Sequence, residues 1–266
     1  MIATALTIAG SDPSGGAGIQ ADLKTFSARK VYGMSVITAL TAQNTMGVNG
    51  VHLIPPTFVA DQLNAILNDI RVGAIKIGMI ANTEIAIAIA DVLQVHSEIP
   101  IVIDPVMIAK GGHSLLDDNA IAVIKKRLFP LANILTPNLP EAASLLDKQT
   151  ATTREEMEQQ GRALLKLGSK AILMKGGHLD GDDSPDLLIS EAGARWFEGQ
   201  RIETKNTHGT GCTLSATLAA ELAKGESLEN AVSNAKNYLL AAIMAADSLD
   251  IGAGHGPTHH FYKLWV

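Results

Sequence analysis

The sequence contains a single cysteine, Cys212, so no intrachain disulfide can form. A lone thiol is typical of proteins that work in a reducing compartment, and we expect a cytoplasmic protein. The first apolar run, residues 5–9, follows no basic segment and is too short for a signal peptide. No apolar stretch approaches the roughly 20 residues of a membrane-spanning helix, so a membrane is not an expected partner.

Aromatic residues make up only 4% of the chain, and no basic stripe alternates with them. Since the net charge is also -6, nucleic acid is not an expected partner. A phosphate-bearing ligand is still compatible with this charge, because helix N-termini and a few lysines bind anions locally. Hydrophobic residues, at 47% of 266, suffice for a sizeable core. The lack of repeats and linker-like segments predicts one domain over residues 1–266.

Short β-prone runs alternate with helical patterns along the chain. Strands are predicted at residues 5–9, 35–41, 75–79, 101–106, 134–136 and 171–175, a hairpin at 187–190 and 195–198, and helices at 19–28, 58–70, 84–95, 120–128, 139–146, 154–167, 212–223 and 228–246. This alternation implies parallel strands joined by right-handed crossovers. Residues 101–103 are apolar on both faces, as a sheet covered on both sides requires, so we expect an α/β fold.

Several candidate residues follow predicted strands. Ligands of open parallel sheets bind beyond the carboxyl ends of the strands. That rule places five candidates along one edge of the sheet: Gly10, Gln43, Asp104, Asn138 and Lys175. Asp104 follows an apolar strand, where a carboxylate needs water, a counter-ion or a bound cation. Lys175 either reaches a phosphate or simply leads into a turn.

The glycine-rich run Gly209, Thr210, Gly211, Cys212 opens a predicted helix. Glycines let several N–H groups point into one hollow, and the helix dipole adds positive potential there. Such a hollow stabilises negative charge on a transferred phosphoryl group, although a plain helix entry has the same pattern. The helix start would lower the pKa of Cys212, whereas a lone cysteine is more often a small buried residue.

Asn138 and Glu141 stand three residues apart after a strand, which is the spacing of a helix capping box. Glu141 in the same position is also suited to hold magnesium near phosphates, and both roles are compatible. The adjacent His259 and His260 invite a metal site, but surface exposure is the commoner state for such a pair near a chain end.

The loop at residues 10–18 contains four glycines and is able to close over a ligand. Residues 16–21 match the dinucleotide-binding fingerprint formally, but the acidic residue that should follow the next strand is absent. Gln43 stands near that position. Its amide suits the edge of an aminopyrimidine, although a solvated rim residue explains it equally.

Taken together, these motifs resemble the hydroxymethylpyrimidine/phosphomethylpyrimidine kinase family of thiamine biosynthesis, within the ribokinase-like superfamily. The matching stretches, in family order, are AGSDPSGGAGIQAD (residues 9–22), QNT (43–45), KIGM (76–79), DPVM (104–107), TPNLPE (136–141), MKGGH (174–178), NTHGTGC (206–212) and GHGPTHHF (254–261). They span nearly the whole chain, and the ordered set is highly specific.

The resemblance implies a three-layer αβα, ribokinase-like fold with a mostly parallel central sheet, usually as a homodimer. It implies ATP and Mg²⁺ as cofactors and two phosphorylations of a hydroxymethylpyrimidine at one site, first on its alcohol and then on the resulting phosphate. The residues that match the family's substrate contacts are Gly10, Asp22, Gln43, Met79 and Val106. Those that match its nucleotide and metal contacts are Asn138, Lys175 and Thr207 for ATP, and Asp104 and Glu141 for magnesium. Gly209, Thr210, Gly211 and Cys212 match its anion hole.

Cys212 is the candidate base. Sugar kinases of the superfamily carry an aspartate there, whereas this family carries cysteine. An alcohol must lose a proton when it attacks, but a phosphate oxygen is already ionised at pH 7. Loss of Cys212 should therefore slow the alcohol step more than the phosphate step. Residues 107–118, with Lys110, Gly111 and Gly112, are predicted to fold over the phosphates.

Three other functions fit parts of the sequence. A pyridoxal kinase of the same fold would phosphorylate a different aromatic nitrogen heterocycle with a hydroxymethyl arm. A nucleotide-dependent oxidoreductase would use residues 16–21, and the missing acidic partner opposes it. A catalytically silent regulator would not need Glu141, Lys175 or the run 209–212.

Overall fold

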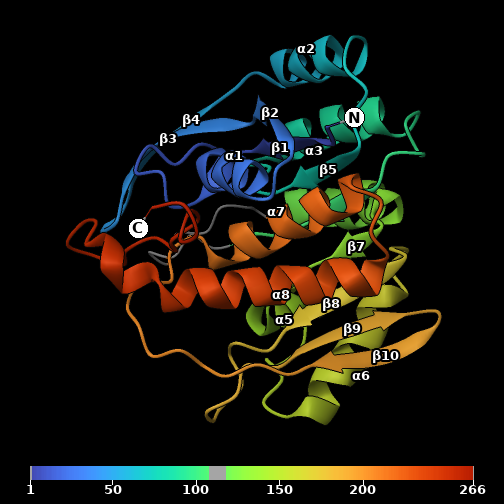
Figure 1. The fold of residues 1–266 in the computed structure, drawn as a ribbon. Coiled ribbons are helices and arrows are strands. Elements are labelled where there is room, and N and C mark those ends of the chain that lie inside the picture. The colour runs from blue at the N-terminus through green and yellow to red at the C-terminus, as the bar shows by residue number, and fades with distance from the viewer. Residues whose placement is uncertain (1, 108–117, 266) are drawn as a thin grey trace.

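An eight-stranded sheet forms the centre of the computed structural model, which describes residues 2–107 and 118–265 (Figure 1). Its spatial order is β10-β9-β8-β7-β6-β5-β1-β2. The strands are β1 (Thr4–Ala9), β2 (Tyr32–Ile37), β5 (Ala74–Ile77), β6 (Ile101–Ile103), β7 (Ile134–Leu135), β8 (Ala171–Lys175), β9 (Asp186–Ser190) and β10 (Gly193–Phe197). The pairs from β2 to β8 are parallel, and β9 is antiparallel to both neighbours, so the sheet is mostly parallel.

Helices cover both faces of this sheet. One face packs on α2 (Pro56–Leu67), α3 (Thr83–Leu93), α4 (Asp118–Val123), the π-helical turn η1 (Ile124–Leu128), α5 (Leu139–Leu146) and α6 (Arg154–Leu165). The other packs on α1 (Gly18–Ala28), α7 (Thr210–Ala223) and α8 (Leu228–Met244). In Figure 1, α7 and α8 lie in front of the strands. The two separate apolar cores confirm the predicted three-layer αβα fold.

The apolar sequence of α7 explains why this helix is deeply buried. In α7 nearly every residue from Thr213 to Glu221 is buried, because α1, α8 and β5 enclose it. Its sequence is accordingly rich in Ala, Leu and Thr and has no charged residue before Glu221. The α7 helix therefore has a fixed position, and so has its N-terminus at the carboxyl edge of the sheet.

The single strand predicted at residues 35–41 is wrong, because these residues belong to two strands, β2 and β3 (Ala39–Asn44), in different sheets. The chain leaves the main sheet at Thr38, whose N–H donates to Ala9 O and whose hydroxyl donates to Met79 O. The next residues form a separate two-stranded sheet of β3 and β4 (Gly47–Leu53). Gln43 is thus placed by this second sheet and does not follow a strand of the main one.

The C-terminal residues also differ from expectation. His259 and His260 are buried, not exposed, and the His260 ring pairs with the hydroxyl of Thr213 at 3.1 Å. Burial lowers the pKa of His260 to about 3, so its ring is neutral. Short 3-10 turns, η2 (Phe129–Leu131) and η3 (Ala246–Leu249), complete the described elements. Within the described ranges, the helices are too short or too polar to cross a bilayer.

Candidate active site

The carboxyl ends of β1, β6 and β8 bring predicted site residues to one edge of the sheet. Gly10 follows β1, Asp104 follows β6 and Lys175 ends β8. Asn138, after β7, forms a parallel bridge with Lys175. These four positions confirm the expected edge, whereas Gln43 reaches it from β3.

Asp104 and Lys175 form the centre of this edge. Lys175 Nζ lies 2.9 Å from Asp104 Oδ1 and 3.7 Å from Glu141 Oε2. Asp104 also accepts hydrogen bonds from the hydroxyls of Thr136 and Ser215. Burial would raise the pKa of Asp104, but the charges of Lys175 and a second lysine outweigh it and lower that pKa. Asp104 is therefore a carboxylate held between cations.

Glu141 differs from Asp104 because burial dominates its titration. Burial raises the pKa of Glu141 to about 7, although the Lys175 ammonium opposes the shift. Its Oε2 accepts from the Asn138 N–H at 2.7 Å, and Asn138 Oδ1 accepts from the Glu141 N–H at 2.8 Å. This is the predicted capping box, and it fixes the Glu141 side chain at the start of α5.

The N-terminus of α7 faces the same cluster. A Cβ added to Gly211 would lie 3.3 Å from Asp104 Oδ2 and 3.4 Å from Lys175 Nζ, so the start of α7 lies close to both side chains. Gly209, the N-cap, has a φ of 80°, and a Cβ on it would lie 1.8 Å from Gly16 O. A side chain at Gly209 is excluded by both conformation and space. The run 209–212 therefore opens a helix beside the cluster, and its role as an anion hole stays a prediction.

The expected lowering of the Cys212 pKa is wrong. Burial raises that pKa to about 11, even though the Lys76 charge and a hydrogen bond from the Gly18 backbone oppose it. The negative charges of Asp22 and Asp104 raise the pKa of Cys212 further. In the free protein at pH 7 Cys212 is a thiol.

Lys76 and Asp22 form an ion pair that sequence reasoning missed. Lys76 Nζ lies 2.8 Å from Asp22 Oδ2 and 3.0 Å from Oδ1, and both side chains have 0% exposure. The Thr7 hydroxyl also donates to Asp22 Oδ2 at 2.6 Å. Burial would lower the pKa of Lys76, but Asp22 and the charges beyond it outweigh burial and raise that pKa. The sequence signal that could have revealed this pair was Lys76 itself, a charged residue inside the otherwise apolar strand Ala74–Ile77.

The residues assigned to the pyrimidine differ in accessibility. Met79 touches Gly10, since a Cβ on Gly10 would lie 2.2 Å from Met79 Cε. Met79, Val106 and Gln43 are half-buried and keep surface for a ligand. Asp22 is fully buried, and both of its carboxylate oxygens accept hydrogen bonds from Thr7 or Lys76. Its direct contact with a substrate stays a prediction.

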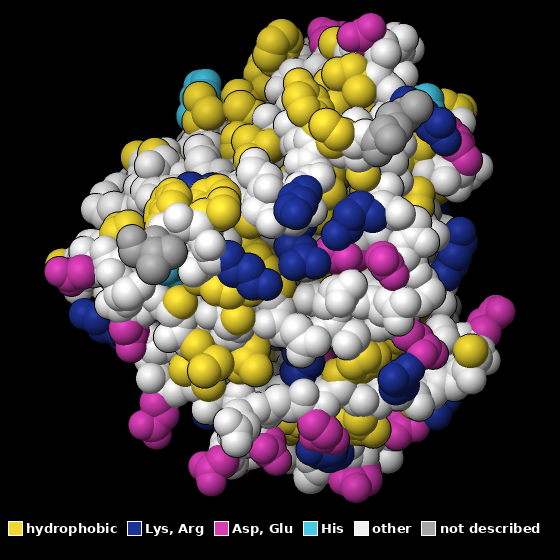
Figure 2. All heavy atoms as spheres, viewed as in Figure 1, with side chains coloured by type: hydrophobic (Ala, Val, Ile, Leu, Met, Phe, Trp, Pro, Cys, Tyr) yellow, Lys and Arg dark blue, Asp and Glu magenta, His cyan; other side chains and the backbone are white. Residues whose placement is uncertain are grey.

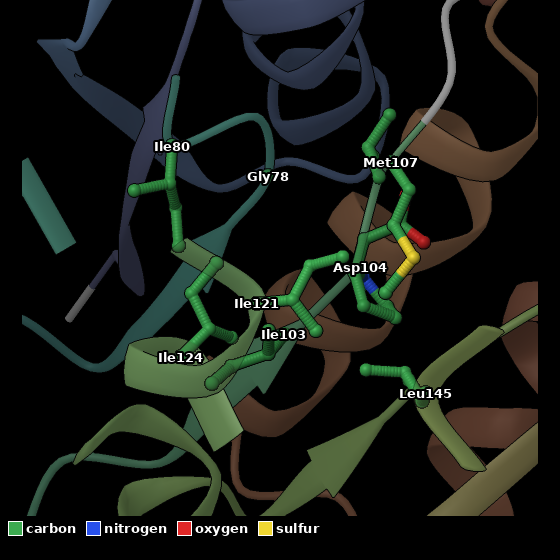
Figure 3. Close-up of a pocket in the computed structure, with 10 residues that line it drawn as sticks. Gly78, Ile80, Ile103, Asp104, Met107, Ile121, Ile124 and Leu145 are labelled. Carbon is green, nitrogen blue, oxygen red and sulfur yellow. The ribbon is translucent and has the colours of Figure 1, made fainter. Parts of the chain in front are cut away.

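Asp104 also borders an apolar pocket. Figure 3 shows its lining of Ile80, Ile103, Met107, Ile121, Ile124 and Leu145, with Gly78 behind. These side chains keep water from one side of the carboxylate, which strengthens its attraction to cations. Met107, the first residue of the predicted cover at 107–118, lines this pocket, and residues 108–117 lie outside the described part of the chain.

The oxygen ligands of this edge are suited to magnesium. Asp104 and Glu141 approach the same ammonium group, so a divalent cation there would have two carboxylates within reach. Mg²⁺ typically takes one or two carboxylates and fills its remaining positions with water and phosphate oxygens. Among the described residues, no group of three or more His, Cys, Asp or Glu is arranged to hold a metal ion.

Thr207 lies in the segment between Asn206 and His208 that leads into α7. Its N–H donates to Lys205 O, and its residue is half-buried. Its predicted contact with ATP stays a prediction. The same segment brings His208 against Asp12 of the glycine-rich loop, a contact that sequence reasoning did not identify.

Comparisons with known proteins agree with these motifs. The family model described as phosphomethylpyrimidine kinase matches residues 12–259. A hydroxymethylpyrimidine/phosphomethylpyrimidine kinase of Salmonella typhimurium is 55% identical over 261 residues, 98% of each chain. The structure of a phosphomethylpyrimidine kinase from Clostridium difficile is 44% identical, has a TM-score of 0.81 and covers 91% of this chain and 100% of its own. An ADP complex of Bacillus subtilis pyridoxal kinase is 36% identical, has a TM-score of 0.89 and covers 98% of both chains.

The buried Lys76–Asp22 pair gives a prediction about stability. Lys76→Met leaves the Asp22 carboxylate buried without its cation, and we expect the free energy of unfolding to fall by about 3–5 kcal/mol. Urea denaturation followed by circular dichroism measures it. The double variant Asp22→Asn/Lys76→Met should lose less, because no unpaired charge remains.

A matched control is the exposed pair of Arg154 and Glu198. Arg154→Met removes a cation of comparable length from water, and it should change stability far less than Lys76→Met. Equal losses in Lys76→Met and the double variant would mean that packing, not charge, determines the cost.

Proposed function

This chain belongs to the hydroxymethylpyrimidine/phosphomethylpyrimidine kinase family, and from that premise we propose how its site transfers two phosphoryl groups to a hydroxymethylpyrimidine. The chain is a kinase of thiamine biosynthesis. Its first acceptor is the alcohol of 4-amino-5-hydroxymethyl-2-methylpyrimidine, and its second is the monophosphate formed. The observation that carries the proposal is that the Asp104–Lys175 ion pair lies close to Gly211 at the start of α7.

The nucleotide phosphates bind between Lys175 and the N-terminus of α7. Lys175 has three N–H donors and gives one to Asp104, so it is able to contact a phosphate as well. The N–H groups at 209–212 stabilise charge that develops on the migrating phosphoryl group, and Asn138 and Thr207 contact the remaining oxygens. Asp104 and Glu141 would hold Mg²⁺, which when bound neutralises phosphate charge.

The pyrimidine lies on the other side of this hollow. Met79 and Val106 offer apolar surface to the ring, and the Gln43 amide offers one acceptor and one donor side to its polar edge. Gly10 lets the ring approach the backbone closely. Asp22 contributes indirectly: its ion pair holds the Lys76 ammonium in place, and that positive charge lies near Cys212.

Pyridoxal is the second candidate acceptor. The high structural similarity to a pyridoxal kinase favours it, since the TM-score of 0.89 spans 98% of both chains. The higher identity of 55% to a hydroxymethylpyrimidine kinase favours the pyrimidine. The two rings share a nitrogen heterocycle and a hydroxymethyl arm but differ in their polar edges.

The first prediction concerns the products. The protein with ATP, Mg²⁺ and the hydroxymethylpyrimidine should give a product heavier by one phosphate and then by two, as mass spectrometry measures. Lys175→Met should lower the rate of both steps about a hundredfold, because a buried donor to the phosphoryl group is lost. ATP consumption without either product, or faster turnover of pyridoxal, would contradict the proposed substrate.

The second prediction concerns Cys212 as the base of the alcohol step. Only a thiolate accepts a proton, and with a pKa of about 11 its fraction rises about tenfold per pH unit from pH 7 to 10. The phosphate step needs no base. We therefore expect the ratio of the alcohol-step rate to the phosphate-step rate to rise about tenfold per pH unit under saturating ATP.

Cys212→Ala is the matched variant for this ratio. It should abolish the rise with pH and slow the alcohol step more than the phosphate step. Taking the ratio removes the titration of Glu141, which affects both steps. A ratio that does not depend on pH in the unmodified protein would assign Cys212 to the lining of the site.

The family implies a homodimer, and we propose that the two copies meet at the second sheet, β3–β4. Two-stranded sheets are marginally stable alone in water, and apolar residues of this one are exposed. They are Leu40, Met46, Val51 and Leu53, with Phe58 of α2 nearby. Figure 2 shows hydrophobic side chains gathered where Figure 1 has β3, β4 and α2. A second copy of the chain, in the cytoplasm, would cover them.

The dimer is tested by sedimentation velocity. Val51→Lys/Leu53→Lys should shift the protein from dimer to monomer, because two charges enter an apolar contact. Val95→Lys is the control, since Val95 is 73% exposed, follows α3 and belongs to neither strand of the second sheet, and the change should leave the mass unchanged. A monomeric unmodified protein would refute the contact.

A further inference from the structure

A buried network links three segments that the substrate and phosphate sites share. His208 Nε2 lies 2.8 Å from Asp12 Oδ2, and these residues are 7% and 1% exposed. Asp12 belongs to the glycine-rich loop after β1, and His208 precedes the N-cap of α7. The third member is Gln43 of β3, whose Nε2 lies 3.4 Å from the same His208 nitrogen.

Asp12 is an acceptor in every one of its side-chain contacts. Its Oδ1 accepts from the Ser14 N–H and hydroxyl, and its Oδ2 accepts from the N–H groups of Gly16 and Ala17. Burial would raise the pKa of Asp12, but hydrogen bonds from His208 and Ser14 outweigh it and lower that pKa to about 2. Asp12 is therefore ionised, and the His208 nitrogen facing it at 2.8 Å must carry a proton.

That proton decides the orientation of the Gln43 amide. A His208 Nε2–H that donates to Asp12 has no lone pair for an amide N–H. At the other end of the amide, the Thr41 hydroxyl donates to Ser11 O at 2.8 Å, so its single proton is not available to Gln43 Oε1 at 3.4 Å. Amide oxygen and nitrogen have the same shape, and hydrogen bonds must distinguish them.

Exchanging the two ends of the Gln43 amide removes both conflicts. The amide NH₂ then donates to the Thr41 hydroxyl oxygen, and the amide oxygen shares the His208 N–H. One lone pair of the oxygen and one N–H of the nitrogen remain for a ligand. The order of acceptor and donor along the amide is then fixed by His208 on one side and Thr41 on the other.

We propose that His208, held as an Nε2–H donor by Asp12, is a specificity-determining positioning residue that fixes the acceptor–donor order of Gln43 to match an aminopyrimidine. The amide oxygen accepts from the exocyclic amino group, and the amide N–H donates to the adjacent ring nitrogen. The inference rests on the proposed function in that the pyrimidine binds at Gln43.

The matching deaminated ring provides the discriminating ligand. In the pyrimidinone with oxygen in place of the amino group, that edge presents an acceptor followed by a ring N–H donor, the reverse order. A fixed Gln43 leaves both pairs mismatched, whereas a free amide turns over and binds it. Rejection of the pyrimidinone therefore measures the fixation of Gln43 and not the general integrity of the fold.

The test compares two variants of similar chemistry. His208→Gln places an amide N–H near the position of Nε2 and should retain discrimination. In His208→Asn the side chain is too short to reach Asp12. The ratio of kcat/KM for aminopyrimidine over pyrimidinone should fall by about tenfold or more. The KM for ATP should stay within about twofold of the unmodified value. Circular dichroism verifies that both variants fold.

A second measurement requires no activity. Long-range ¹H–¹⁵N spectra of histidine-labelled protein, with His208 assigned by its loss in His208→Gln, should show a protonated Nε2 in the unliganded protein. An unprotonated Nε2, or unchanged discrimination in His208→Asn, would overturn the inference. If the unmodified protein phosphorylates neither ring, the proposed function fails instead, and these spectra alone decide the state of His208.

Discussion

The carboxyl edge of the sheet depends on one constraint, that each charge removed from water must meet an opposite charge from another element. Lys76 of β5 meets Asp22 of α1, and Lys175 of β8 meets Asp104 after β6. Unpaired, each of these groups would cost several kcal/mol. Pairing across elements fixes the distances between strands and helices at the site, because an ion pair near 3 Å tolerates little displacement. The architecture is therefore most tightly specified where the chemistry takes place.

The same pairing leaves the site short of positive charge. Asp104 and Glu141 share one ammonium, and the pKa of Glu141, raised to about 7, reports that its ionised form lacks a sufficient partner. In the proposed function, an arriving metal–nucleotide complex would supply that charge, and its phosphates would accept from the N–H groups of α7. A phosphate that enters this cluster would lose its hydration, but the opposite charges and N–H groups would offset most of that cost.

The sequence predicted most elements because periodicity and capping are local. The capping box of Asn138 and Glu141 and the strand at 171–175 follow from neighbours within a few residues. The failures arose where distant segments decide. The strand at 35–41 was divided because Thr38 bonds to both Ala9 and Met79. The Cys212 pKa and the burial of His259 and His260 depend on residues that only the fold brings near, so a local rule about helix starts or chain ends gave the wrong sign.

The segments proposed to recognise the ring and to stabilise the phosphoryl group are directly connected. Gly209 contacts the Gly16 carbonyl so closely that no side chain fits, and the His208 before it is bonded to Asp12. The glycine-rich loop proposed to border the substrate is thereby joined to the helix start proposed to bind phosphate. Since near-attack geometry requires the two reactants within about 3–3.5 Å, a rigid link between their binding segments lowers the entropy cost of reaching it. The loop and the helix start cannot separate without breaking the buried Asp12–His208 hydrogen bond. In the proposed function, the alcohol and its longer phosphate would therefore adjust to the site through movements of the ligand and the nucleotide.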